Sequence, residues 1–141
     1  MIKIYTDGSC IGNPGKGGWA AIIFENEKKL IISGSEENTT NNRMELKAPI
    51  EALKKLSNEN KIEVFTDSKY VKQGITEWIK NWKNNNWKTA SKQNVKNVDL
   101  WKELDNLSSN LDIKWTWVKG HSDVAYNNEV DELARNAAES N

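Results

Sequence analysis

The chain has 141 residues, of which 28% are charged and 37% hydrophobic, a length and composition typical of one globular domain. No apolar run approaches the roughly 18 residues that a membrane-spanning helix needs. The first residues alternate and soon include an acid, unlike a secretory signal peptide. These features exclude a membrane-spanning protein, and we expect a cytoplasmic monomer formed by a single domain over residues 1–141.

The formal net charge is zero, with 20 basic and 20 acidic residues, which by itself does not indicate a nucleic-acid-binding protein. However, the charges are unevenly distributed along the chain. Residues 69–98 contain seven lysines and one acid, so this segment carries +6 and the remainder carries −6. A protein with separated charges can hold a polyanion on one side and cations on the other.

Five strands are expected from the alternation of apolar and polar residues. In chain order they cover Ile2–Tyr5, Gly18–Phe24, Leu30–Ser33, Ile62–Phe65 and Ile113–Trp117. The second and third are joined by a polar turn around Asn26 and should form a hairpin. The odd-numbered positions of the fifth strand should face the core.

Two longer helices are expected from the helical spacing of apolar residues. One begins at the cap-like pattern Asn42-x-x-Glu45, and the other covers Val130 to Ala137. Shorter helices should cover residues 70–73, 76–83 and 100–107. The order of elements predicts an α/β fold: a five-stranded mixed sheet, with three antiparallel strands plus parallel strands from the later crossovers, flanked by helices.

Four acidic residues are predicted to meet at one edge of this sheet. Asp7 and Asp67 each follow an aromatic residue and a threonine at the end of a predicted strand, so parallel pairing of those strands would bring their carboxylates together. Glu45 and Asp131 are expected in the first turns of their helices, facing the same edge. Such a cluster requires either raised pKa values or bound cations, because the carboxylates repel one another.

A site with oxygen ligands and no Cys or His cluster favours Mg²⁺ or Mn²⁺ over zinc. Two such ions roughly 3.5–4 Å apart can activate a water and stabilise the leaving oxygen of a phosphodiester. His121, the only histidine, lies in a turn-like stretch before the last helix. It could exchange a proton with the leaving group near neutral pH, or it could be an exposed imidazole with no role.

The lysine-rich segment also contains tryptophans. Trp78 and Trp82 are four residues apart and share a helix face, whereas Lys80 and Lys83 lie mostly on another face, where they could contact phosphates. Anchoring a protruding helix to the core is favoured for the tryptophans over base stacking, because a duplex offers no unstacked base.

Five motifs, in order and spacing, resemble those of type 1 ribonuclease H. They are Tyr5-Thr6-Asp7-Gly8-Ser9 with Gly12-Asn13-Pro14-Gly15, Asn41-Asn42-Arg43-Met44-Glu45-Leu46, Thr66-Asp67-Ser68, Val118-Lys119-Gly120-His121 and Asp131-Glu132-Leu133-Ala134. The resemblance covers about residues 2 to 138. It implies a ribonuclease H-like fold and a metal-dependent endonuclease. Such an enzyme cuts the RNA strand of RNA–DNA hybrids without sequence dependence, leaving 5′-phosphate and 3′-hydroxyl ends.

By position, the resemblance implies that Asp7, Glu45, Asp67 and Asp131 bind two Mg²⁺ ions when substrate is present, and that His121 is a mobile catalytic histidine. It implies substrate contacts at Asn13, Thr40, Asn41, Asn42, Lys69, Trp78, Trp82, Lys83 and Lys88, the last four in a basic protrusion of about residues 78–98. Turn and cap chemistry is the alternative reading of the Asn13 and Asn41 regions. Lys69 stands where glutamine is frequent, so a phosphate contact would replace a base-edge hydrogen bond.

Two alternatives are a binding module that keeps the fold without cutting, and a transposase or integrase core. All four acids speak against the binding module, since an anionic cluster has no use beside a polyanion. The transposase reading does not account for the turn at Asn13 or for the stretch Lys119-Gly120-His121.

Overall fold

The computed structural model describes residues 1–56, 61–119 and 125–140. Its strands are β1 (Ile2–Ile11), β2 (Gly15–Glu25), β3 (Lys28–Thr39), β4 (Lys61–Thr66) and β5 (Asp112–Trp117). Its helices are α1 (Asn41–Lys54), α2 (Lys69–Gln73), the π-helical turn η1 (Gly74–Trp78), α3 (Ile79–Asn84), α4 (Val98–Ser108) and α5 (Ala125–Glu139). No described helix is both long and apolar enough to cross a membrane.

The strands form one mixed sheet in the order β3-β2-β1-β4-β5. β1 pairs antiparallel with β2, and β2 pairs antiparallel with β3, whereas β4 is parallel to both β1 and β5. This confirms the predicted sheet. The first three strands are longer than predicted, because their backbone pairing continues into exposed segments that do not alternate, as in the pair Ile11 and Lys16. Side-chain alternation reports burial and does not reveal such pairing.

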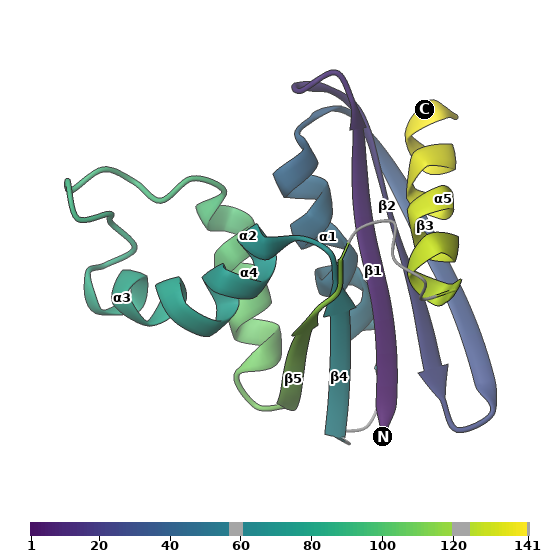
Figure 1. The fold of residues 1–141 in the computed structure, drawn as a ribbon. Coiled ribbons are helices and arrows are strands. Elements are labelled where there is room, and N and C mark those ends of the chain that lie inside the picture. The colour runs from purple at the N-terminus through teal and green to yellow at the C-terminus, as the bar shows by residue number, and fades with distance from the viewer. Residues whose placement is uncertain (57–60, 120–124, 141) are drawn as a thin grey trace.

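Helices cover both faces of the sheet (Figure 1). On one face, Ile4 of β1 and its partner Ile23 of β2 belong to a core that includes Leu46 of α1 and Leu104 of α4. On the other face, the neighbouring pair Tyr5 and Ile22 packs with Val130 and Ala134 of α5. The period of two in β1 therefore separates the two cores.

Three local expectations were wrong. The N-cap of α1 is Thr40, whose hydroxyl accepts a hydrogen bond from the Arg43 amide at 3.2 Å, so the helix begins one residue before Asn42 and Glu45 lies beyond its first turn. Asp131 is likewise not in the first turn of α5. At the end of β5, Trp117 does not face the core, because 37% of it is exposed.

The two short helices predicted over residues 70–73 and 76–83 form one helical run, α2-η1-α3, joined through the π-helical turn. Gly74 begins this turn and lies against the buried Trp101, where an added Cβ would come within 2.1 Å of the indole. The Trp82 ring packs edge-on against Trp101 at a centroid distance of 5.3 Å, and Trp78 packs against Trp82 at 5.9 Å. These tryptophans anchor the helical run, beyond which residues 85–97 extend away from the sheet (Figure 1).

Lys92, in this extended segment, has a left-handed backbone with φ of 65°. The conformation costs an L-residue about 1 kcal/mol or more and costs glycine almost nothing. Because Lys92 is exposed, Lys92→Gly should raise the free energy of unfolding by up to about 1 kcal/mol in denaturant titrations. Lys92→Ala, which keeps the strain, is the matched control. Equal stability of the two variants would contradict the prediction.

Candidate metal centre

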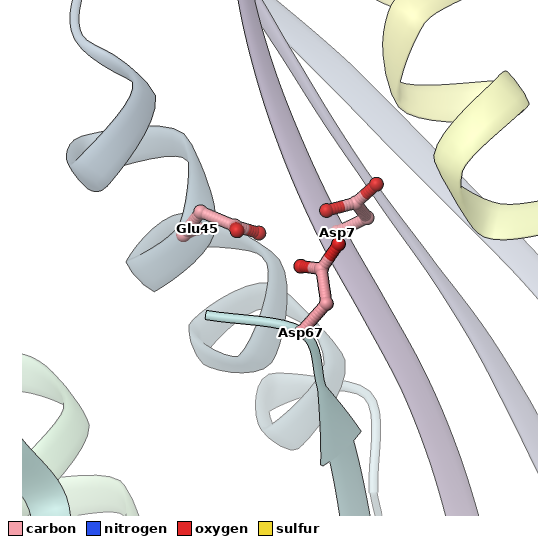
Figure 2. A group of neighbouring side chains, drawn as sticks. All are labelled: Asp7, Glu45 and Asp67. Carbon is pink, nitrogen blue, oxygen red and sulfur yellow. The ribbon is translucent and has the colours of Figure 1, made fainter. Parts of the chain in front are cut away.

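Three carboxylates from three separate elements converge at one edge of the sheet. Asp7 belongs to β1, Glu45 to α1, and Asp67 directly follows β4. One oxygen of each lies within 4.8 Å of the others, and Figure 2 shows the three side chains around a common space. The structure thus brings together three of the four acids predicted to meet.

The pairing of β1 with β4 places Asp7 beside Asp67. Tyr5 is the register partner of Phe65, so two residues further along each chain the two acids stand next to each other. β4 ends at Thr66, immediately before Asp67, as predicted. β1 does not end at Asp7, contrary to the expectation, but continues to Ile11 in its pairing with β2.

Glu45 is held in place by the backbone of β1. The Gly8 amide donates a hydrogen bond to Glu45 Oε1 at 2.7 Å. A Cβ at position 8 would lie 2.4 Å from the Glu45 nitrogen, so the approach of α1 to β1 requires glycine here. The glycine after Asp7 therefore serves the site by admitting the helix that carries Glu45.

The backbone around Asp67 is held by the end of β5. The Val118 amide donates to the Thr66 carbonyl at 2.8 Å, and the Trp117 indole N–H donates to the Asp67 carbonyl at 3.0 Å. The Lys69 ammonium lies over the Trp117 ring, 5.0 Å from its centroid. Sequence reasoning did not identify Trp117 as part of the site. One sequence signal could have indicated its role: Trp117 is an aromatic residue at the end of β5, which is parallel to β4 and so ends near Asp67.

Burial dominates the electrostatics of the cluster. It raises the pKa of Asp7 to about 9, helped by the charge of Asp67 and a hydrogen bond with Asp131. Burial, followed by the charges of Asp7 and Asp67, also raises the pKa of Glu45 well above its usual value. The cluster therefore either keeps protons near neutral pH or takes up positive charge.

Asp131, the fourth predicted acid, lies near Asp7 but outside the group of three. Its carboxylate is 3.4 Å from the Arg135 guanidinium one turn along α5, and it is close enough to Asp7 to raise the pKa of that residue. His121 lies outside the described residues.

The predicted polar contacts gather at the start of α1. Asn13 Oδ1 accepts a hydrogen bond from the Asn41 amide at 3.2 Å, which joins the turn after β1 to the helix. Asn13, Asn41 and Asn42 are exposed, and Thr40 caps the helix that carries Glu45. All four residues lie within five positions of Glu45 or are bonded to such a residue.

On the protrusion, Lys83 is 3.3 Å from the Asp105 carboxylate, and the Lys88 ammonium donates to the Asn94 side chain. A groove of about 260 Å³ is lined by Trp78, Asn81, Trp82, Asn85, Lys88, Thr89 and Ala90. Three of the four substrate-contact residues expected on the protrusion, Trp78, Trp82 and Lys88, thus line one groove.

Arg43 links the start of α1 to α4, a role the sequence did not reveal. Its guanidinium bonds both oxygens of Asp99, at 3.0 and 2.7 Å, and also the Asn97 side chain at 3.2 Å. Hydrogen bonding to Arg43 lowers the pKa of Asp99. The partners are more than 50 residues apart, so no local pattern could pair them.

Comparison with known proteins decides the family. The family model described as RNase H matches residues 1–139. The chain belongs to the ribonuclease H family. It is 60% identical over 136 residues to Ribonuclease H of Wolbachia pipientis wMel, covering 96% of this chain and 94% of the relative. Ribonuclease H of Pseudoalteromonas atlantica is 55% identical over 137 residues, covering 97% and 90%. Among solved structures, LC9-RNase H1, a type 1 RNase H, superposes with a TM-score of 0.87 at 31% identity, covering 99% of this chain and 72% of that one.

The three clustered residues fit a divalent metal, as ribonuclease H chemistry requires. All three supply carboxylate oxygens, the ligands that hard cations prefer. Asp67 Oδ1 is buried and has no hydrogen-bond partner among the described residues. A buried carboxylate oxygen of this kind normally has a donor or a cation beside it.

Proposed function

We propose that this chain is an endonuclease that hydrolyses the RNA strand of RNA–DNA hybrids, independent of sequence, leaving 5′-phosphate and 3′-hydroxyl ends. The observation that carries the proposal is the cluster of Asp7, Glu45 and Asp67, in a chain whose relatives are named Ribonuclease H. Two alternatives considered from the sequence, a binding module and a transposase core, have no comparable support.

In this proposal Asp7, Glu45, Asp67 and Asp131 hold the metal, with Mg²⁺ as the physiological ion and Mn²⁺ as a substitute. When bound together with substrate, two such ions supply an activated water and charge stabilisation for the leaving oxygen. The protein contributes the spacing of the carboxylates. β1 and β4 fix two of them, and the Gly8 amide fixes Glu45. We assign proton exchange with the leaving group to His121.

The polar residues around the start of α1 are suited to recognising the hybrid. Thr40, Asn41 and Asn42 lie at the N-terminal end of α1, the helix that carries Glu45, and Asn13 is hydrogen-bonded to the Asn41 amide. Amide side chains there can hydrogen-bond a 2′-hydroxyl, which distinguishes RNA from DNA. Lys69, Lys83 and Lys88 would contact phosphates, and Trp78 and Trp82 line the protrusion's groove.

The charge distribution supports one further part of the proposal. The acids carry the metal and the segment of residues 78–98 carries positive charge, so a single domain over residues 1–141 could engage the hybrid as a monomer. A cytoplasmic location remains an expectation based on composition.

The test is an RNA–DNA hybrid labelled differently on each strand, incubated with the protein in Mg²⁺, in Mn²⁺ or in chelator. RNA–RNA and DNA–DNA duplexes of the same sequence are the controls. We expect cuts at many positions of the RNA strand of the hybrid, with metal only. A hybrid that is bound but remains intact in both metals would favour the binding module, and cutting of the DNA strand would contradict the assignment of substrate.

A further inference from the structure

Trp117 connects two residues that the proposed function uses separately. Its indole N–H donates to the Asp67 carbonyl at 3.0 Å, and its ring lies under the Lys69 ammonium at 5.0 Å. Asp67 is a candidate metal ligand, and Lys69 a candidate phosphate contact. The Trp117 side chain therefore contacts both Asp67 and Lys69. It lies at the end of β5, whereas Asp67 and Lys69 follow β4.

Core packing does not account for the position of Trp117. Its neighbour on the same face of β5, Trp115, packs against the main core, whereas 37% of Trp117 is exposed. The indole N–H is a hydrogen-bond donor only, and in an exposed side chain water can satisfy it. Here the N–H donates to the main-chain carbonyl of Asp67, the residue that follows β4.

The environment of Lys69 differs from that of the other candidate lysines. Lys83 is within ion-pair distance of Asp105, whereas among the described residues Lys69 has no such carboxylate and lies over an aromatic face. Lys69 and Trp117 also border a hollow of about 310 Å³, whose other lining residues are Lys72, Gln73, Thr76 and Glu77. A cation over an indole keeps its charge and a defined place while its outer side stays available to an anion.

We propose that Trp117 is a positioning residue that fixes the Asp67 backbone and the Lys69 ammonium relative to each other. The metal ligand and the phosphate contact then form one rigid unit, so that binding of a substrate phosphate at Lys69 places the chain's next phosphates against the carboxylates. The inference rests on the proposed function. It adds a residue that neither contacts the metal nor reacts.

Two substitutions separate the two contacts. Trp117→Phe keeps an aromatic face under Lys69 and removes the N–H, so Mn²⁺ affinity of the protein without substrate should fall about two- to tenfold, the scale of one hydrogen bond. Its kcat at limiting Mn²⁺ should fall in parallel and recover at saturating Mn²⁺, and its KM for hybrid should stay unchanged.

Trp117→Leu removes both contacts. It should show the same loss of Mn²⁺ affinity and, in addition, about two- to fivefold weaker binding of the hybrid in chelator, the scale of an exposed cation–π contact. Lys69→Gln should weaken hybrid binding, reduce its salt dependence by about one ion, and leave Mn²⁺ affinity unchanged. Combining Lys69→Gln with Trp117→Leu should weaken hybrid binding no further than Lys69→Gln does, because both changes act on one ammonium.

Thr116→Val is the matched control. Thr116 precedes Trp117 on β5 and points to the opposite face, and the change removes its 2.7 Å hydrogen bond to Glu63 of β4. It should leave Mn²⁺ affinity, KM and hybrid binding unchanged. If both Trp117 variants match Thr116→Val in a wild type that cuts hybrid, the inference is overturned and the proposed function stands. If the wild type itself neither binds Mn²⁺ nor cuts hybrid, the proposed function fails first, and the inference fails with it.

Discussion

Asp67→Asn is expected to reduce cleavage of the RNA strand by about 10²- to 10³-fold or more, the scale of losing one charge stabiliser at a reacting centre. The change removes the negative charge of the Asp67 carboxylate. One oxygen of that carboxylate, Oδ1, is buried and has no hydrogen-bond partner among the described residues. Initial rates on a labelled hybrid at saturating Mg²⁺ measure the loss.

Unfolding would not explain this loss, because the same substitution should make the protein more stable in chelator. The charge of Asp67 raises the pKa values of Asp7 and Glu45, so its removal relieves repulsion within the cluster. Hybrid binding in chelator should be unchanged or tighter, since one charge near the phosphates is gone. Asp112→Asn, at the opposite end of the sheet, is the matched control. Cleavage by Asp67→Asn at the rate of Asp112→Asn would contradict the assignment.

The stability of the protein in chelator should fall as the pH rises from about 6 to about 9, and Mg²⁺ should restore it most at the alkaline end. The pKa of Asp7 is raised to about 9 in the folded chain, from an ordinary value of 3.8, and that of Glu45 is also raised. Above the pKa that these carboxyls have in the unfolded chain, the unfolded chain has released protons that the folded chain still holds. Each further rise in pH up to the folded-state pKa therefore favours unfolding. A cation reverses this by favouring the charged carboxylates.

Thermal unfolding at several pH values, in chelator and in Mg²⁺, measures both effects. Asp7→Asn should show a shallower fall with pH. Asp99→Asn should keep the full alkaline fall, because Arg43 lowers the pKa of Asp99 and that group titrates in acid. A melting temperature in chelator that is flat or rises over this pH range would be inconsistent with a cluster of buried carboxylates.

The order and pairing of the elements could be predicted from the sequence because each strand carries its own pattern. Ile2 and Ile4 alternate with Lys3 and Tyr5, and this period assigned the faces of β1 correctly. The parallel neighbours β1 and β4 then placed Asp7 beside Asp67, as expected from two matched Thr-Asp steps. Polar strand ends were less predictable, because strand pairing depends on backbone groups that every residue has. The start of α1 was misplaced because Thr40, Asn41 and Asn42 are all residue types that can cap a helix.

The supporting contacts of the site could not be predicted, because they join residues far apart in sequence through groups of no distinctive type. The Gly8 amide reaches Glu45 across 37 positions, and Trp117 reaches Asp67 across 50. Trp117 was expected in the core on the basis of strand alternation, which predicts burial only as far as the core extends along that face of the strand. At the end of β5 the core no longer covers the strand, and the same side chain becomes available to the site.

The most direct measurement is anomalous diffraction from Mn²⁺ in crystals of the Asp131→Asn variant, which we expect to be inactive, bound to an RNA–DNA hybrid. This variant keeps the three clustered carboxylates. We predict anomalous peaks in contact with Asp7, Glu45 and Asp67, with a phosphate of the RNA strand at the same ions. Peaks elsewhere on the protein, or a DNA-strand phosphate at the cluster, would contradict the assignment of these acids as the centre that cuts RNA.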